Sequence, residues 1–570
     1  MTRPSRTLGP ALCLLLVVIP PGAASDSLSA RLRSFHREVP RDAYAQPAQP
    51  ARFSPGIRVA APGFFSVQVN VADSGRNILG DAANEPTIAV DPRNPQRMSI
   101  GWRQFNTVAS NFRQAGYGYT TDGGQTWRFP GVIQPGVFRS DPVLDADGEG
   151  RFYYNSLTSS GGDYRCDVFT SVTGGAGWGP GVAARGGDKQ WMAVDRTGGP
   201  GDGHIYSFWT DTWSICPPGF FTRSVNGGAS YEACTIIPGD PFWGTLAVGP
   251  AGELYAFGAG GSAFTLARSS TARDSASGVS WEMSVPVNLD GQVVAFAGST
   301  SPNPGGLHGQ AWVAVDGSDG PSAGSVYVLC SVERTSVPDP LDVMFARSTD
   351  RGLTWSPPVR VNDDAGTSAW QWFGTMSVAP GGRLDVVWLD TRDDPGTVLS
   401  SLYYAYSYNG GRTWSPNIRL SQAFDPHLGW PQQDKMGDYF HMVSDEAGAH
   451  LAWAATFGGE QNVFYGRITH PFVGVVPDGA GAPPAEPFLG SYPNPFNGIS
   501  TIQYRLAEPG RVRIAVYDML GREVSLLADA GEDASLHAVR WDAGARAAGV
   551  YFCRLLTEKG ARTLRLLLLP

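Results

Sequence analysis

Acids, arginines and aromatic residues recur at the ends of apolar, strand-like segments in this sequence. Carboxylates can transfer protons, guanidinium groups can bind anions, and aromatic rings offer flat apolar faces. This mixture suits a saccharide site, provided that the fold brings the residues together. The residues that open the first segment of each pair are Asn84, Glu85, Asp141, Asp188, Lys189, Gln190, Trp191, Phe242, Trp243, Gln310, Trp312, Gln371, Trp372, Asp438 and Tyr439, and those that end the second are Arg103, Asp211, Arg334, Asp390 and Arg392.

These residues belong to a unit that recurs along the chain. Each copy has an apolar strand, a turn rich in Asp and Gly, and a second apolar strand, which together predict a hairpin. The copies begin EPTIAVDP, SDPVLDADGEG, DKQWMAVD, FWGTLAVGPAG, QAWVAVDG, WQWFGTMSVAPGG and DYFHMVSDEAG. The last copy continues with a third strand, NVFYGRI, and residues 66–71 near the N-terminus can supply its fourth strand. Such a pairing would join the two ends of the domain.

A second motif follows most of these hairpins. Residues 120–127 read TTDGGQTW, residues 348–355 read STDRGLTW, and residues 407–414 read SYNGGRTW; we call this pattern the Asp box. The weaker copies end at Trp178, Tyr231 and Trp281. Successive box ends lie 51, 53, 50, 74 and 59 residues apart, a spacing that suits one four-stranded propeller blade per repeat. We therefore predict an all-β fold containing a β-propeller of seven blades, with six blades as the alternative.

The Asp boxes have a structural interpretation. Asp or Asn followed by Gly makes a tight turn, and the side-chain oxygens can bind exposed turn amides. An acid repeated in blade after blade is better placed for turn formation than for catalysis, and the closing Trp is expected to pack between blades. The residues of this structural set are Asp122, Trp127, Asp350, Trp355, Asn409 and Trp414. The turn at residues 145–148, DADG, lacks the later acidic ligand of a calcium loop and is expected to be an ordinary hairpin turn.

Composition and charge agree with many short strands and exclude some partners. The 72 glycines and 44 prolines disfavour long helices. A net charge of -9 without clusters of Lys or Arg argues against nucleic acid as a partner. The sequence shows no convincing metal-ligating or cofactor-binding motif, so we expect neither a metal nor a cofactor.

The N-terminus has the plan of a secretory signal. Arg3 and Arg6 precede an apolar run over residues 8–19, and small residues follow. Because this run is too short to cross about 30 Å of hydrocarbon, we expect a cleaved signal peptide and no transmembrane helix after its removal. Export permits disulfides, and Cys216 and Cys234 are the expected pair because they flank one predicted hairpin. Cys166, Cys330 and Cys553 lie in apolar runs and are expected to be buried thiols.

A second domain follows a linker rich in Pro, Gly and Ala. Alternating apolar strands separated by Gly turns predict a small immunoglobulin-like β-sandwich. The YPNPFN opening at residues 492–497, the YDMLGREV hairpin and the GVYFCRL strand resemble type A sorting domains of type IX secretion and their relatives with a FlgD-like fold. The resemblance implies recognition by secretion machinery and a secreted or cell-surface location. The expected divisions are signal peptide 1–24, N-terminal extension 25–64, propeller 65–470, linker 471–489 and sorting domain 490–570.

The Asp boxes and blade spacing resemble the non-viral sialidase (BNR repeat) superfamily. The resemblance implies a glycoside hydrolase that removes terminal sugars of the sialic-acid type from glycans. In that mechanism three arginines bind the substrate carboxylate, a tyrosine attacks the anomeric carbon, and acids transfer protons. The matching candidates are Arg103, Arg334 and Arg392 for the arginines, Tyr439 for the nucleophile, Asp141, Asp188 and Glu85 for proton transfer, and Asp390, Trp191, Trp312 and Trp372 for the remaining substrate contacts.

The sequence departs from that family at one motif. The Phe/Tyr-Arg-Ile-Pro motif that supplies the first arginine is absent, and WRFP at Trp127 belongs to an Asp box instead. Two alternatives therefore stay open: a non-catalytic surface propeller that binds glycans or proteins, and a hydrolase or lyase for another polysaccharide.

Overall fold

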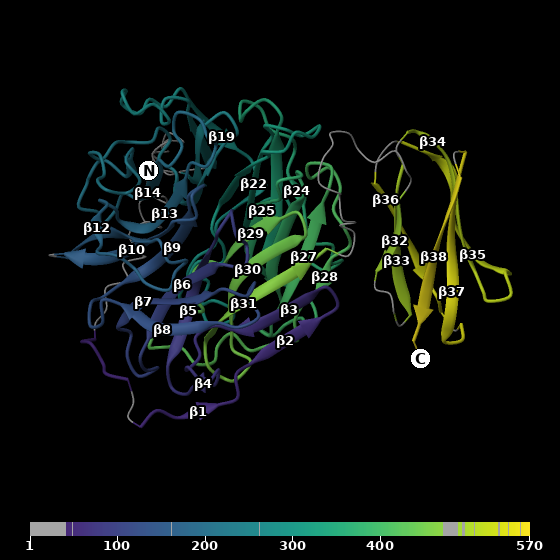
Figure 1. Cartoon of the computed structure of the whole chain (residues 1–570), viewed down its shortest axis with the longest axis horizontal. Coiled ribbons are helices and arrows are strands. Elements are labelled where there is room, and N and C mark those ends of the chain that lie inside the picture. Colours follow the sequence, from purple (N-terminus) through teal and green to yellow (C-terminus); the bar gives the residue numbers. More distant parts are fainter. Residues whose placement is uncertain are drawn as a thin grey trace, which may run out of the picture.

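The computed structural model describes residues 42–470 and 488–569, except for short gaps at 48–49, 161, 261–262, 493–495, 497, 507, 534–535, 545 and 559. The described residues form strands, turns and loops (Figure 1), and they include no helix able to cross a membrane. The predicted all-β class is confirmed. The expected signal peptide and most of the expected linker lie outside the described residues.

Antiparallel sheets follow one another along residues 64–469. The first sheet has the strand order β5-β6-β7-β8, so each strand pairs with the next one in the chain. The strands of the first three sheets are β5 (Ala82–Val90), β6 (Met98–Phe105), β7 (Arg113–Thr120), β8 (Arg128–Ile133), β9 (Ser140–Ala146), β10 (Phe152–Ser160), β11 (Asp163–Ser171), β12 (Val182–Ala183), β13 (Asp188–Val194), β14 (Ile205–Thr210) and β15 (Phe221–Ser224). Those of the fourth to seventh sheets are β16 (Phe242–Val248), β17 (Leu254–Ala259), β18 (Phe264–Ser269), β19 (Met283–Val287), β20 (Gly291–Gln292), β21 (Trp312–Val315), β22 (Val326–Arg334), β23 (Asp342–Ser348), β24 (Val359–Arg360), β25 (Gln371–Val378), β26 (Leu384–Asp390), β27 (Ser401–Ser407), β28 (Ile418–Arg419), β29 (His441–Asp445), β30 (Gly448–Ala455) and β31 (Asn462–Thr469).

The sheets are arranged in a ring. Strands β5, β9, β13, β16, β21, β25 and β29 each contact the next of the series, and β29 contacts β5. These strands therefore surround a central channel, and we interpret each of the seven described sheets as one blade.

The N-terminal part of the chain closes the ring. Strand β3 (Phe64–Gln68) pairs with β31 of the seventh sheet, with Val67 opposite Tyr465. Figure 1 shows β3, from the beginning of the chain, beside β31, which lies almost 400 residues later. Strand β2 (Arg58–Ala61) extends the same sheet, while β1 (Phe53–Ser54) pairs with β4 (Asn77–Ile78). The closing pair expected from the sequence is present.

The Asp boxes form hairpin turns between the third and fourth strands of a blade. In the first box, Asp122 Oδ1 accepts hydrogen bonds from the Thr120 hydroxyl at 2.7 Å and the Thr126 amide at 3.0 Å. Asp350 makes the same bonds at 2.7 and 2.9 Å, and Asn409 occupies the equivalent place in the third box. These side chains therefore hold their own turns together.

The box tryptophans pack between neighbouring blades, as predicted for this motif. Trp127 of the first blade lies 5.3 Å from the Tyr465 ring of the seventh, and Trp414 of the sixth lies 5.1 Å from Phe345 of the fifth. Trp355 contacts the apolar core of the fourth and fifth blades.

Local features of the cysteines and of the DADG turn also match expectation. Cys216 and Cys234 form a disulfide, while Cys166, Cys330 and Cys553 are buried free thiols. In the DADG turn, Asp147 Oδ1 accepts hydrogen bonds from the amides of Glu149 and Arg151, which makes it a hairpin turn between β9 and β10.

The C-terminal domain is a sandwich of two antiparallel sheets, with strand orders β32-β33-β36 and β35-β34-β37-β38. Its core includes Trp541, Ile514, Tyr551 and the free thiol Cys553. The first strand begins at Phe488, inside the segment expected to be linker. The strands are β32 (Phe488–Tyr492), β33 (Ile499–Arg505), β34 (Gly510–Tyr517), β35 (Glu523–Glu532), β36 (Leu536–Asp542), β37 (Gly549–Thr557) and β38 (Gly560–Leu568).

Candidate functional site

A repeated β-bulge turns residues at the start of the innermost strands toward the channel. In five blades the pairing register between the first and second strands shifts by a β-bulge. Each shift lies near the N-terminal end of the first strand. A residue with positive φ lies at each shift: Glu85, Asp141, Lys189, Trp243 and Phe373. Such conformations are uncommon for residues other than Gly and cluster at functional sites. The bulges bring Glu85, Asp141 and Lys189 from three consecutive blades to one end of the channel, here called the upper end.

Lys189 lies at the centre of this group. Its ammonium Nζ is 2.6 Å from Asp438 Oδ2, 3.3 Å from Asp141 Oδ2 and 3.9 Å from Glu85 Oε1. Asp438 precedes β29 of the seventh blade, which does not neighbour the third blade in the ring. An ion pair between these blades is possible only in the channel itself.

Three further cations complete the group. Lys435 Nζ lies 2.7 Å from Asp438 Oδ2 and 3.7 Å from Glu85 Oε1, and Arg103 Nε lies 3.0 Å from Glu85 Oε2. Arg113 Nε donates a hydrogen bond to Ser140 Oγ at 3.0 Å, and Ser140 donates to Asp141. The upper charge cluster thus consists of Glu85, Asp141, Asp188, Asp438, Arg103, Arg113, Lys189 and Lys435, all buried.

Gly437 allows the segment that carries Lys435 and Asp438 to approach Glu85. It has φ +96°, and a Cβ placed on it would lie 2.5 Å from Glu85 Cγ. Any other residue would clash with the Glu85 side chain and be strained in its backbone. Glycine at this position therefore lets Lys435 and Asp438 reach Glu85.

Burial and charge separate the pKa values of the carboxyl groups. Burial raises the pKa of Asp188 to about 7, even though Lys189 opposes this shift. Burial also opposes ionisation of Asp141, but Lys189, Arg103 and the Ser140 hydroxyl outweigh it and lower the pKa to about 2. Burial raises the pKa of Glu85 well above its usual range. The same cluster therefore contains a carboxyl that titrates near neutral pH and a carboxylate that stays ionised.

Asp188 differs from the other three acids in its contacts. Among the described residues its carboxyl group makes no hydrogen bond or ion pair, whereas Glu85, Asp141 and Asp438 are each paired with a cation. Its side chain is nevertheless almost completely buried, at 3% exposure. A buried carboxyl without a partner favours its protonated form.

Tyr439 joins the same end of the channel but keeps its proton. Its hydroxyl donates a hydrogen bond to the carbonyl of Pro142 at 3.0 Å, and burial raises its pKa well above the usual range. A phenol in this state is a poor nucleophile. The structure thus brings together all four residues predicted for catalysis, but the surroundings of Tyr439 do not activate it.

The three predicted arginines have separate partners. Arg103 pairs with Glu85, whereas Arg334 pairs with Asp290 and Asp342, at 2.9 and 3.1 Å. Arg392 pairs with Asp390 at 2.8 Å and with Asp363 at 2.7 Å. Arg334 and Arg392 thus belong to local ion pairs of the fifth and sixth blades, and Asp390 is the partner of Arg392, so these residues do not form a substrate clamp with Arg103.

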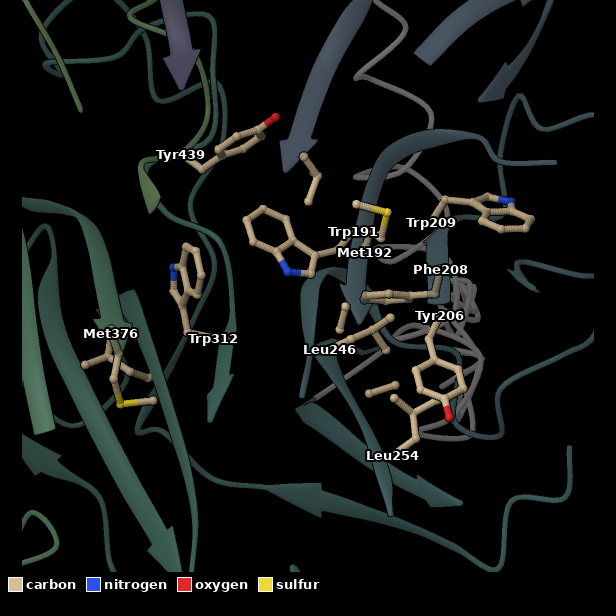
Figure 2. Packing of buried hydrophobic residues seen from close by; sticks show 14 of the residues in the cluster. Trp191, Met192, Tyr206, Phe208, Trp209, Leu246, Leu254, Trp312, Met376 and Tyr439 are labelled. Carbon is tan, nitrogen blue, oxygen red and sulfur yellow. The ribbon is translucent and has the colours of Figure 1, made fainter. Parts of the chain in front are cut away.

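The predicted tryptophans divide into two kinds. Trp191 and Trp312 come from the third and fifth blades, and their ring centroids are 5.0 Å apart in the channel. Figure 2 shows Trp191 between Trp312 and Tyr439, whose ring is 5.6 Å from that of Trp191. Trp372 instead packs on Phe373 and donates a hydrogen bond to Ser400. Trp372 is therefore part of the core.

Sequence patterns singled out Arg103 as a candidate and placed Lys189 at a strand opening, but they did not single out Arg113 or Lys435. Lys189 follows Asp188 directly, and Lys435 lies three residues before Asp438. A basic residue beside an acid at a strand opening was the available signal. Arg113 opens the third strand of its blade, a position that the pattern of first and second strands does not include.

The C-terminal strands account for the location of the protein. Residues 491–568 match a family model described as a secretion system C-terminal sorting domain. This segment is a sorting domain. The protein is accordingly exported and resides at the cell surface or outside the cell.

The solved structures that resemble this chain include distant likenesses. A search of curated proteins finds no match. Among solved structures, a protein of unknown function from Dyadobacter fermentans is 12% identical, with a TM-score of 0.39 over 71% of this chain and 99% of that one. Trypanosoma rangeli sialidase is 11% identical, with a TM-score of 0.36 over 89% of each chain. An α-L-arabinofuranosidase from Fusarium graminearum is 10% identical, with a TM-score of 0.26 over 74% of this chain and 98% of that one. Likenesses of this size assign no activity to the chain.

Proposed function

We propose that the protein is an exported glycoside hydrolase that removes terminal sugars from glycans. The observation that carries this proposal is the contrast between Asp188 and Asp141 in one cluster. Asp188 has a pKa of about 7 and no partner among the described residues, while Asp141 has a pKa of about 2 and is ionised. Glycoside hydrolysis requires one carboxyl that donates a proton and a second that is ionised.

The two carboxyl groups take different roles in this proposal. Asp188 protonates the oxygen of the leaving group. Asp141, held by Lys189 and Ser140, acts on the opposite side as base or nucleophile. Tyr439 positions the Pro142 carbonyl next to Asp141 through its hydrogen bond and does not attack the sugar.

The charge of the cluster favours an acidic sugar of the sialic-acid type. Four cations, Arg103, Arg113, Lys189 and Lys435, face four acids in the upper charge cluster. Burial raises the pKa of Asp188 to about 7, so that one of the four acids is protonated over part of the neutral range. The excess of positive charge would then attract a sugar carboxylate.

The test is hydrolysis of fluorogenic glycosides by the full exported chain. Wild type is expected to release the fluorophore from a sialoside faster than from neutral glycosides, and kcat/KM should fall as the pH rises above about 7. Asp188→Asn should reduce kcat by about 100-fold or more, because general acid catalysis contributes that much. The matched control is Asp319→Asn, an exposed acid outside the channel. Failure of wild type to hydrolyse any glycoside, or full activity of Asp188→Asn, would contradict the proposal.

A second candidate, a non-catalytic glycan-binding propeller, is favoured by the burial of the cluster. Two segments beside Asp438 are tied together: Asn303 Nδ2 donates to the Gly437 carbonyl and the Leu307 amide to Asp438 Oδ1, both at 2.8 Å. A glycan must displace or pass such a cover before it reaches Asp188. Retention of intact ligand on a glycan array, without release of free sugar, would support this candidate over the hydrolase.

A further inference from the structure

The channel contains a second feature, at the end opposite the upper charge cluster. Residues two apart along a strand face the same side. Small or short side chains occupy the positions that lie two residues after Trp191, Thr245, Trp312, Thr375 and His441, and these positions therefore also face the channel. This lower ring consists of Ala193, Ala247, Ala314, Ser377 and Val443, with Asp145 from the second blade, and all six residues line a cavity of about 600 Å³.

Aromatic rings separate this cavity from the upper charge cluster. Trp191 contacts Trp312 at 5.0 Å and His441 at 5.6 Å, while His441 lies parallel to Trp312 with an interplanar angle of 9°. These three residues come from three different blades and meet in the channel, where Figure 2 shows Trp191 and Trp312. They form the floor of the cavity, which is distinct from the surroundings of Asp188 and Asp141.

The charged groups beside the cavity neutralise each other. Asp145 Oδ1 accepts a hydrogen bond from Arg196 Nη1 at 2.6 Å, and Asp145 Oδ2 accepts one from the Val194 amide at 2.8 Å. Burial lowers the pKa of His441 to about 4, so the imidazole is neutral at pH 7. The cavity therefore offers no unpaired charge to an ionic ligand.

One polar group on the floor can orient a ligand. The Ile88 amide donates a hydrogen bond to His441 Nδ1 at 3.2 Å. The neutral ring consequently carries its proton on Nε2, which can donate to an acceptor atom in the cavity.

We propose that this lower cavity binds a small uncharged molecule with an aromatic ring and one hydrogen-bond acceptor. Its volume lies in the range of small-molecule sites, its floor offers the aromatic faces of Trp191 and Trp312, and its walls present both polar and apolar atoms. The site goes beyond the proposed hydrolysis, because it uses neither Asp188 nor Asp141 and lies on the other side of the aromatic floor.

The test uses the full chain and the neutral fluorophore 6-propionyl-2-(dimethylamino)naphthalene, whose ketone oxygen is a hydrogen-bond acceptor. We expect saturable one-to-one binding with enhanced emission, and energy transfer from the tryptophans of the floor. Ala314→Trp and Ser377→Trp fill the cavity from two different blades and should weaken binding at least tenfold. The matched control Ala276→Trp places the same side chain at an exposed position and should bind as wild type does.

Two further measurements separate this site from the hydrolase site and from misfolding. Asp188→Asn should bind the fluorophore with unchanged affinity, whether or not the chain hydrolyses glycosides. Trp312→Phe, a smaller change, should reduce the transfer of excitation to the bound fluorophore. Absence of saturable binding by wild type, or wild-type affinity in both cavity-filling variants, would overturn the proposal.

Discussion

Lys189 and Asp438 are joined across the channel, with the ammonium nitrogen 2.6 Å from the carboxylate oxygen. The same ammonium also lies 3.3 Å from Asp141, so one lysine links the second, third and seventh blades. Both side chains of the pair are fully buried. Water can therefore solvate neither charged group unless the channel opens.

Replacing Lys189 by Met should destabilise the propeller strongly. The change leaves Asp141, Asp438 and Glu85 with less positive charge in a buried site, and breaking a buried ion pair costs about 3–5 kcal/mol. Unfolding in urea, followed by tryptophan fluorescence, measures the loss. The matched control is Arg93→Met, which removes an ion pair with Glu149 whose side chains are 57% and 62% exposed. Equal stability of the two variants would show that the central pair contributes no more than a surface pair.

Asp188 should make stability depend on pH. Its pKa is about 7 in the folded protein and about 4 in an unfolded chain. The folded state therefore holds the proton more tightly than the unfolded chain does. The resulting contribution of Asp188 to the free energy of unfolding is complete below pH 4 and is lost as the pH rises through 7. Asp188→Asn cannot ionise and should be more stable than wild type at pH 8, by on the order of a few kcal/mol. Urea midpoints of both proteins between pH 4 and 8 give the comparison, and parallel curves would contradict the prediction.

The Asp box turns should contribute to stability and not to catalysis. Asp350→Ala removes hydrogen bonds to Ser348 and to the amide and hydroxyl of Thr354, and should cost about 1–2 kcal/mol. Glycoside hydrolysis measured below the melting temperature should be unchanged. Asp319→Ala, at an exposed position, is the control. A loss of kcat in Asp350→Ala with unchanged stability would reverse the structural interpretation.

Strand β3, which closes the ring, should contribute strongly to the stability of the propeller. Phe64 of β3 is 4% exposed and packs in the core of the sixth and seventh blades. Phe64→Ala should cost about 3–5 kcal/mol, the usual loss for a buried Phe. Phe53→Ala, on strand β1, changes a side chain that is 36% exposed and should cost less than about 1 kcal/mol. Thermal unfolding of both variants checks the difference.

Much of the fold could be predicted because its signals are local. The Asp box turns are held by bonds within eight residues, and the hairpin pattern repeats in every blade. The pair β3 and β31 was also predictable, because NVFYGRI needed a partner strand and residues 66–71 supplied an apolar one. The expected start of the second domain, residue 490, lies inside β32, which begins at Phe488.

The candidate site was predictable only in part, because its geometry depends on the bulges and on contacts across the channel. Strand openings correctly collected Glu85, Asp141, Asp188 and Tyr439 at one end. The same logic placed Arg334 and Arg392 with them, but nearby aspartates hold both arginines elsewhere. No sequence spacing indicates that Lys189 lies against Asp438, because that distance is set by the closure of the whole ring.

That closure has a kinetic consequence. Strand β3 is synthesised before the propeller sheets, yet its partner β31 comes from their very end. Until that end is available, β3 cannot pair, and pairing over such a sequence separation is slow. An open ring also presents unpaired strand edges, which are templates for association with other chains. In a concentrated sample, β3 of one molecule can therefore pair with β31 of a second molecule and complete its ring. The products would be domain-swapped oligomers instead of separate propellers.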